Sequence, residues 1–223
     1  MTLTPRQQLS LFIVLAFIID YLPIINLPFL WSETFFHEIS HGLAALLTGG
    51  TIHNITLNFN GSGVCTTSGG TRFLIAFSGY AGSALWGLLI YSIADTLSQA
   101  KAKLMVAIMV TMLALTLLLW ARNISTIIIL LILLLMYATP LYKSLWFRVK
   151  FFIQLVAVFI MLDAIRNPLY LLDGRDLGDG ANLSKLTWLP EFFWVALWLV
   201  IAVGCLYFLW KAGDENETVE RIE

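Results

Sequence analysis

Charged residues are scarce in this sequence. Only 12% of its 223 residues are charged and 59% are hydrophobic, and the mean hydropathy is +0.85. Soluble domains carry about 25% charged and 45–50% apolar residues, so the composition excludes an ordinary soluble domain. Because about 20 consecutive apolar residues cross a bilayer, the composition predicts a polytopic membrane protein.

Cysteines are also few, and basic residues form no cluster. Cys65 and Cys205 lie in a predicted loop and a predicted late span, which argues against a disulfide framework. The net charge is −1 and no basic run occurs, so nothing suggests a nucleic-acid partner. The first apolar run is too long for a signal-peptide core and lacks a small-residue cleavage site, so we interpret it as a span.

The apolar runs predict an all-α polytopic membrane protein with about seven transmembrane helices. The predicted spans are approximately Leu9–Ile25, Pro28–Leu47, Phe73–Ile93, Leu104–Trp120, Ile124–Ala138, Phe151–Leu172 and Phe192–Trp210. Residues 51–72 alternate between polar and apolar types around a Gly-Ser-Gly turn, which predicts a β-hairpin after the second span. We expect a single transmembrane domain over residues 1–210 and a disordered acidic tail over residues 211–223.

The second predicted span contains a His-Glu-x-x-His motif, formed by His37, Glu38 and His41. Positions i and i+4 of a helix share a face, so the two imidazoles can bind one metal ion. Two histidines, a third ligand and a water describe a catalytic zinc site, in which Glu38 is placed to act as general base. Such motifs also occur by chance on soluble helices. Ionisable groups within an apolar span are costly unless they are functional, which favours the metal site.

A catalytic zinc site needs a third protein ligand. His53 falls in the predicted hairpin and is interpreted as a loop residue. The acidic candidates are Asp20, Asp163, Asp173, Asp176 and Asp179. Counting membrane crossings puts Asp163 level with the two histidines and the later aspartates near the surface, unless their loop folds back. Asp163 is the predicted ligand. The alternatives are Asp20, also at middle depth, and a salt bridge of Asp163 with Arg166.

With these residues in place, the chain resembles the site-2 protease family of intramembrane zinc metalloproteases, and more closely a compact peptidase branch without PDZ or CBS domains. Residues 37–42 match the family's H-E-x-x-H-G. Residues 46–50, together with the predicted hairpin and its turn at residues 61–63, match the membrane-associated β-hairpin that follows this motif in the family. Residues 162–166 are similar to the family's L-D-G-G-(R/H), whose aspartate is the third zinc ligand.

The chain departs from the family pattern at two places. Ala164 and Ile165 replace the two glycines after the predicted ligand, and residues 167–174 look like the family's Asn/Pro-rich stretch in a displaced position. Residues 178–183 resemble a second Asp-containing stretch of the compact branch. Asp173 and Asp179 therefore stay in competition with Asp163 as the third ligand.

The resemblance implies an enzyme that cleaves peptide bonds in or near transmembrane segments of membrane proteins. His37, His41 and Asp163 would bind Zn²⁺, and Glu38 would activate the zinc-bound water as nucleophile. The expected partners are a transmembrane protein substrate and the lipid bilayer, with no nucleic acid. The hairpin edge at residues 51–59 could bind the unwound substrate as an added strand. The family resemblance places the protein, as a multi-pass protein, in a bacterial plasma membrane.

Two other functions stay open. A membrane protein that keeps a metal-stabilised core only to bind partners would not need Glu38. A transporter that relays ions predicts paired, Gly- or Pro-broken spans with inverted symmetry, and we find no such repeat in the sequence.

Overall fold

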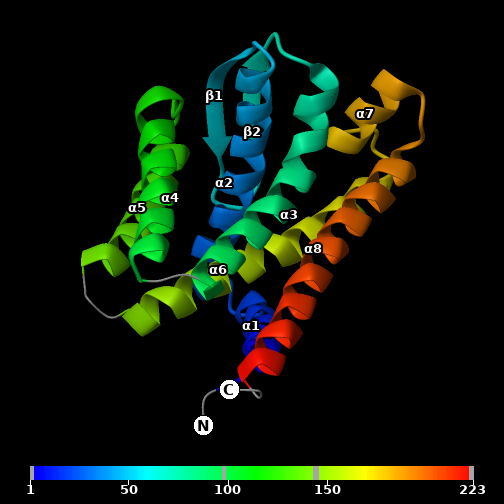
Figure 1. Cartoon of the computed structure of the whole chain (residues 1–223). Coiled ribbons are helices and arrows are strands. Elements are labelled where there is room, and N and C mark those ends of the chain that lie inside the picture. The colour runs from blue at the N-terminus through cyan, green and yellow to red at the C-terminus, as the bar shows by residue number, and fades with distance from the viewer. Residues whose placement is uncertain (1–2, 97–98, 143–145, 221–223) are drawn as a thin grey trace.

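The computed structural model describes residues 3–96, 99–142 and 146–220. Its elements are α1 (Pro5–Asp20), α2 (Pro23–Leu47), β1 (Thr51–Leu57), β2 (Gly63–Ser68), α3 (Arg72–Thr96), α4 (Gln99–Leu119), α5 (Ile124–Tyr142), α6 (Trp146–Arg166), the 3₁₀ helix η1 (Asn167–Asp173), α7 (Asp179–Thr187) and α8 (Glu191–Glu220). The mostly helical fold with one small antiparallel sheet is confirmed (Figure 1).

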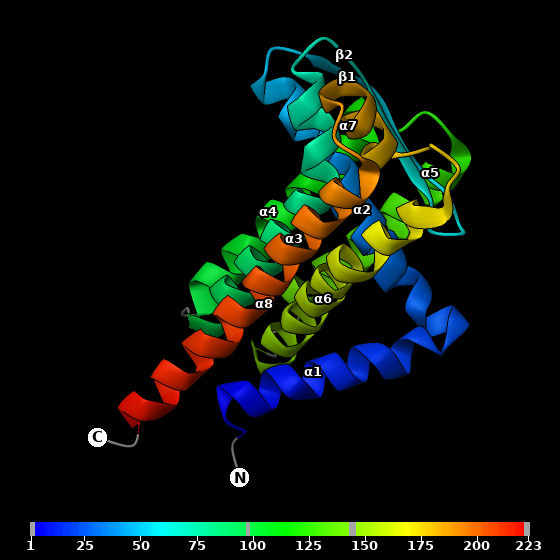
Figure 2. The same cartoon turned by 90° about the vertical axis from the view of Figure 1, so that its right-hand side faces the viewer.

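Four long helices, α2, α3, α6 and α8, pack against one another and form the body of the molecule (Figures 1 and 2). The α4–α5 pair lies on one side of this body, and α7 lies against the ends of α3 and α8. The beginning of α1 contacts the C-terminal half of α8. In this contact Arg6 Nε donates a hydrogen bond to the Trp210 carbonyl at 3.3 Å. The β-hairpin and α7 lie at the opposite end of the body.

A sharp bend separates α1 from α2. The two helices meet at 116°, and the break falls at Tyr21 and Leu22 rather than at the predicted end near Ile25. Leu22 has φ −109° and ψ 88°, outside the helical region, which a following proline disfavours. Pro28, which we expected to begin the second span, lies inside α2.

Fewer helices are long and apolar enough to cross a membrane than the seven that the sequence predicts. Among the described residues, Arg72–Ala94 of α3 and Glu191–Gly213 of α8 each qualify, and the bent α1–α2 pair makes a third if it is one span. The apolar parts of α4 and α5, Lys103–Leu119 and Ile124–Thr139, are shorter. Seven transmembrane helices therefore stay a prediction.

The β-hairpin has one edge engaged by the α4–α5 connection. The Ile55 N–H donates to the Trp120 carbonyl at 3.1 Å, and the Leu57 N–H donates to Thr126 Oγ1 at 2.7 Å. These bonds occupy the outer edge of β1, so the predicted substrate-binding edge at residues 51–59 is wrong. The other strand, β2, pairs with β1 along one edge. Its second edge faces away from the α4–α5 connection.

The acidic C-terminal segment is helical over most of its described length. Helix α8 continues to Glu220, so it includes residues 211–220 of the tail that the sequence predicted to be disordered. Residues 221–223 lie outside the described residues.

Candidate metal centre

His37 and His41 project from the same face of α2 toward α3. Nδ1 of His41 lies 2.6 Å from the backbone carbonyl of Ile75 on α3. A carbonyl only accepts hydrogen bonds, so this contact places the His41 proton on Nδ1. Nε2 of His41 therefore has a free lone pair for a metal ion, the arrangement commonly found in metal-binding histidines.

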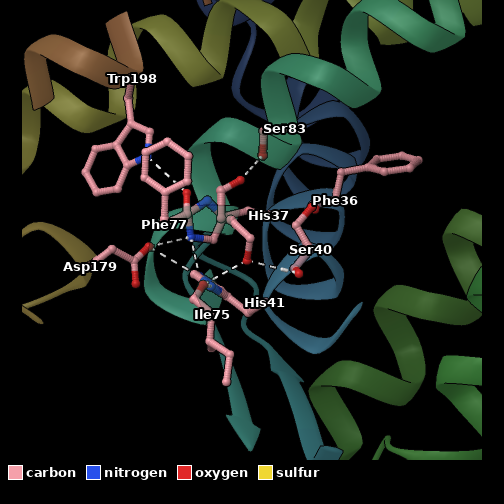
Figure 3. Close-up of polar contacts among 11 residues, drawn as sticks. Phe36, His37, Ser40, His41, Ile75, Phe77, Ser83, Asp179 and Trp198 are labelled. Carbon is pink, nitrogen blue, oxygen red and sulfur yellow. Dashed lines mark hydrogen bonds and ion pairs between the residues drawn. The ribbon is translucent and has the colours of Figure 1, made fainter. Parts of the chain in front are cut away.

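Asp179 completes a cluster with the two histidines (Figure 3). Its Oδ2 lies 3.2 Å from Nε2 of His37 and 3.2 Å from Nε2 of His41, and the two Nε2 atoms are 3.0 Å apart. In a tetrahedral site with zinc–ligand distances near 2.0 Å, neighbouring ligand atoms lie ~3.3 Å apart. The three atoms therefore have nearly the spacing of one face of a zinc coordination tetrahedron.

The segment after α6 folds back to bring Asp179 to the histidines. Helix α6 ends at Arg166, and the turns that follow use positive φ angles at Gly174 (77°) and Gly178 (91°), which glycine adopts without strain. Asp179 is the first residue of α7. The buried face of α7 packs in a small apolar cluster with α3 and α8 that includes Leu183 and Trp198. This packing holds α7, and Asp179 at its start, against α3 and α8.

Asp179 is suited to bind a cation. Burial raises the pKa of its carboxyl, but the neighbouring imidazoles of His41 and His37 hold that pKa well below its usual range. The group is therefore ionised near neutral pH, as a carboxylate ligand must be.

Asp163, the predicted third ligand, lies outside the cluster of His37, His41 and Asp179. Its side chain is buried on α6 and is hydrogen-bonded to Glu33 and Asn167. The alternative, a salt bridge of Asp163 with Arg166, is not formed, because Arg166 pairs with Asp20 of α1. Counting membrane crossings predicted the level of Asp163 along the helices, but it could not predict the direction in which the carboxyl group of Asp163 points.

The remaining aspartates make other contacts. Asp173 pairs with Arg175 in an exposed turn, and this ion pair lowers the pKa of its carboxyl. Asp176 has φ 53° in the same turn, and its backbone carbonyl accepts a hydrogen bond from Lys185 at 3.3 Å. His53 hydrogen-bonds Ser68 across the hairpin at 2.8 Å, in agreement with its interpretation as a residue outside the site.

Glu38 is buried beside the hairpin. Its carboxylate accepts a hydrogen bond from the backbone N–H of Cys65 on β2. A Cβ atom at Gly63 would lie 2.7 Å from Oε1 of Glu38, so only glycine lets β2 pass this close. Burial, with a smaller effect of Glu38, raises the pKa of the Cys65 thiol to about 12, which makes Cys65 unreactive as a nucleophile near neutral pH.

Helix α3 passes directly against the two imidazole rings. A Cβ atom at Gly79 would lie 2.6 Å from His41 Nε2 and from Cε1 of both histidines. The next residue, Tyr80, meets the His37 ring edge-on, with ring centroids 4.5 Å apart. Trp198 of α8 holds this part of α3 by donating from Nε1 to the Phe77 carbonyl at 3.0 Å (Figure 3).

These groups line one open cavity of about 1130 Å³. His37, Glu38, His41, Asp163 and Asp179 all contribute to its wall, together with residues 63–69 of β2 and the following turn. The cavity therefore brings the clustered ligand atoms, two further buried carboxyls and a β-strand edge to one place.

Comparisons with known proteins support this arrangement. A family model described as Peptidase M50B-like matches residues 10–209. Neither the curated proteins nor the solved structures gave a match. The matched range includes the two histidines, Glu38 and Asp179, and the family implies a metal cofactor. The chain belongs to the Peptidase M50B-like family and is a site-2-protease-like metallopeptidase of the membrane.

Proposed function

We propose that the protein is an intramembrane zinc protease in which His37, His41 and Asp179 hold the ion and Glu38 is the general base. The observation that carries the proposal is the cluster of three ligand atoms beside a buried glutamate in one cavity. A zinc ion held there would polarise the substrate carbonyl and lower the pKa of a bound water to ~7.

Glu38 accepts the proton of the attacking water and passes it to the departing amine. The hydrogen bond from the Cys65 N–H restrains the Glu38 carboxylate at the wall of the cavity. The Asp179 carboxylate would also balance part of the charge of a bound ion. Both roles use an ionised carboxylate, and the burial of Glu38 shields it from bulk water.

The substrate is a transmembrane segment of another membrane protein, and β2 supplies its docking edge. Ile55 directs its N–H away from β2, so Cys65, which lies opposite Ile55, directs its backbone groups away from β1. The Cys65 N–H on this edge is used by Glu38, so a substrate strand would pair with the other outward backbone groups of β2. Alternate residues 63, 65 and 67 share this edge, which borders the cavity. A substrate helix would have to unwind locally, because helical carbonyls are already hydrogen-bonded, and the unwound part would add to β2 as a strand.

Removal of the metal tests the proposal. Purified protein in zinc should cut a model transmembrane substrate within its apolar segment, as mapped by mass spectrometry of the products. A chelator should reduce cleavage to background, and added Zn²⁺ should restore it, because the ion polarises the carbonyl that is attacked. Cleavage that persists in chelator, with metal shown to be absent, would refute a metal-dependent protease. Cuts confined to regions outside the apolar segment would refute intramembrane cleavage.

Gly79→Ala should reduce bound zinc at least tenfold. The added methyl group would collide with the ring atoms of both histidines, which cannot move apart without leaving the metal-binding geometry. Zinc bound per protein is the measurement. Gly204→Ala on α8 is the matched control, because a Cβ atom there meets nothing within 4 Å. The control should bind zinc normally and change the free energy of unfolding by about 1 kcal/mol or less. Full zinc binding by Gly79→Ala would show that the rings have more freedom than this packing allows.

A further inference from the structure

Two basic side chains, Arg72 and Lys185, line the cavity, and the proposed mechanism uses neither of them. Arg72 is the first residue of α3 and Lys185 lies near the end of α7, and both are exposed. Neither forms an ion pair with another described residue. Lys185 donates to the Asp176 backbone carbonyl at 3.3 Å, and Glu191, a carboxylate that interacts with its charge, does not line the cavity. Both positive charges are therefore available to a group that enters the cavity.

Helix α7 runs back along the first turns of α3 (Figure 1). Gly79 of α3 lies against the imidazole rings that contact Asp179, the first residue of α7. Farther from the rings, Ala76 of α3 and Leu183 of α7 belong to one apolar cluster. The residue numbers therefore fall along α3 as they rise along α7, and the start of α3 comes level with the end of α7.

This antiparallel arrangement brings the two cations to the same end of the cavity. Arg72 precedes Gly79 by two turns, ~10 Å along the axis of α3. Lys185 follows Asp179 by almost two turns, ~9 Å along the axis of α7. We call the part of the cavity wall formed by Arg72 and Lys185 the basic end. It lies ~10 Å from the ligand atoms.

The charges of the cavity wall are separated along its length. The three acids of the wall, Glu38, Asp163 and Asp179, all lie close enough to His37 or His41 to interact with them electrostatically. A bound metal ion would offset these acids, whereas no described acid of the wall offsets the basic end. A substrate carboxylate is therefore attracted to the basic end rather than to the ligand atoms.

The edge of β2 leads from Glu38 to the basic end. Gly63 lies against Glu38, and the cavity wall continues through residues 64–69 to Arg72. A strand rises ~3.3 Å per residue, so a substrate strand on β2 covers ~10 Å in three residues. The side chain three residues from the cleaved bond therefore comes level with the basic end.

We propose that Arg72 and Lys185 are specificity residues that bind a substrate carboxylate. The preferred substrate is a transmembrane segment with an acidic side chain three residues from the cleaved bond, on the side that lies toward the basic end. This inference rests on the proposed protease function. Neither residue touches the reacting atoms. Exposed ion pairs are individually weak, so the charge sets a preference among substrates and is no absolute requirement.

Charge exchange between enzyme and substrate tests this role. The substrates are one model transmembrane segment with Glu, Gln or Lys placed three residues before or three residues after the cleaved bond. At one of these two positions, wild-type protein should cut the Glu segment with a kcat/KM about fivefold above that of the Gln segment. The Lys segment should be poorer still, and high salt should reduce these differences. Arg72→Glu/Lys185→Glu should prefer the Lys segment to the Glu segment, with bound zinc unchanged.

The single variants Arg72→Gln and Lys185→Gln should each reduce the preference for Glu, and they test the inference even if the doubly reversed protein does not fold. Arg122→Glu is the matched control, because Arg122 lies in the α4–α5 connection and does not line the cavity. It should keep the wild-type preference. Equal cleavage of the Glu, Gln and Lys segments by wild type would overturn the inference. So would an unchanged preference in the single variants, or an equal loss on all segments, which would point to contact with lipid headgroups instead.

A binding measurement separates this inference from the proposed function. Fluorescence anisotropy gives the Kd of the same segments for Glu38→Gln protein, which is expected not to cut them. The Glu segment should bind about fivefold more tightly than the Gln segment, and Arg72→Glu in the same background should remove this difference. If wild type cut no segment in zinc but the binding preference were present, the protease function would be refuted and the basic end would stand. Equal Kd values would refute the basic end.

Discussion

Asp179→Ala should lose its metal ion and, with it, all cleavage above background. The substitution removes the carboxylate that lies 3.2 Å from both Nε2 atoms and leaves two imidazoles to hold the ion. Loss of a group that only supports a metal ligand commonly costs 10–100-fold in affinity. Removal of a ligand itself should cost more than ~100-fold. Metal content and the zinc dissociation constant, measured on the purified protein, provide the test.

The appropriate comparisons are alanine at Asp173 and asparagine at Asp163. Asp173 is in the same segment but is engaged with Arg175 in an exposed turn, so its replacement should leave zinc binding intact. Asp163→Asn should also keep its zinc, since Asp163 lies outside the ligand cluster. If Asp179→Ala retained its zinc while Asp163→Asn lost it, the third ligand would be Asp163, as the spacing of the sequence motifs first suggested.

Glu38→Gln should abolish cleavage while zinc stays bound. Glutamine has the shape of glutamate, and its side-chain oxygen can still accept the hydrogen bond from the Cys65 N–H. It cannot take a proton from water at neutral pH, so the general-base contribution, about 10²–10⁴-fold, is lost. The measurements are the single-turnover cleavage rate and bound zinc on the same preparation.

Glu38→Asp is the informative companion. It retains a carboxylate but withdraws it by one methylene group, so cleavage should fall less than in Glu38→Gln. Equal residual rates in the two variants would indicate that the carboxylate does not act as a base. Loss of zinc from Glu38→Gln would assign Glu38 a part in metal binding instead.

The parts of the site that could be predicted from sequence are those that depend on one helical turn. His37 and His41 share a face because any α-helix places i and i+4 together, and the identity of Glu38 as a neighbour follows from the same spacing. The hairpin was equally predictable, because alternating polar and apolar residues around a Gly-Ser-Gly turn are a local pattern.

The third member of the cluster depended on tertiary structure. The prediction from membrane crossings treated the chain after Asp163 as the end of a straight span. In the structure the chain turns back after Arg166 and places α7 against α3 and α8. The glycines on either side of Asp179 were the available signal. Gly178 adopts φ 91°, and a Cβ atom at Gly180 would lie 2.6 Å from Oε1 of Glu191. Neither requirement can be recognised until the fold is known.

The edge strand was missed for a similar reason. Which side of a hairpin is free depends on what packs against the other side, here the connection between α4 and α5.

Asp179 lies on α7, late in the chain, and this position has a consequence for biosynthesis. The two histidines emerge from the ribosome early, and α7 emerges only after α3 to α6 have been made. A bound ion would tie these distant parts of the chain together and close a long loop, as a covalent cross-link does. If His37, His41 and Asp179 hold the ion as proposed, a nascent chain has an incomplete ligand set until α7 docks, and it would be unable to cleave other proteins before that point.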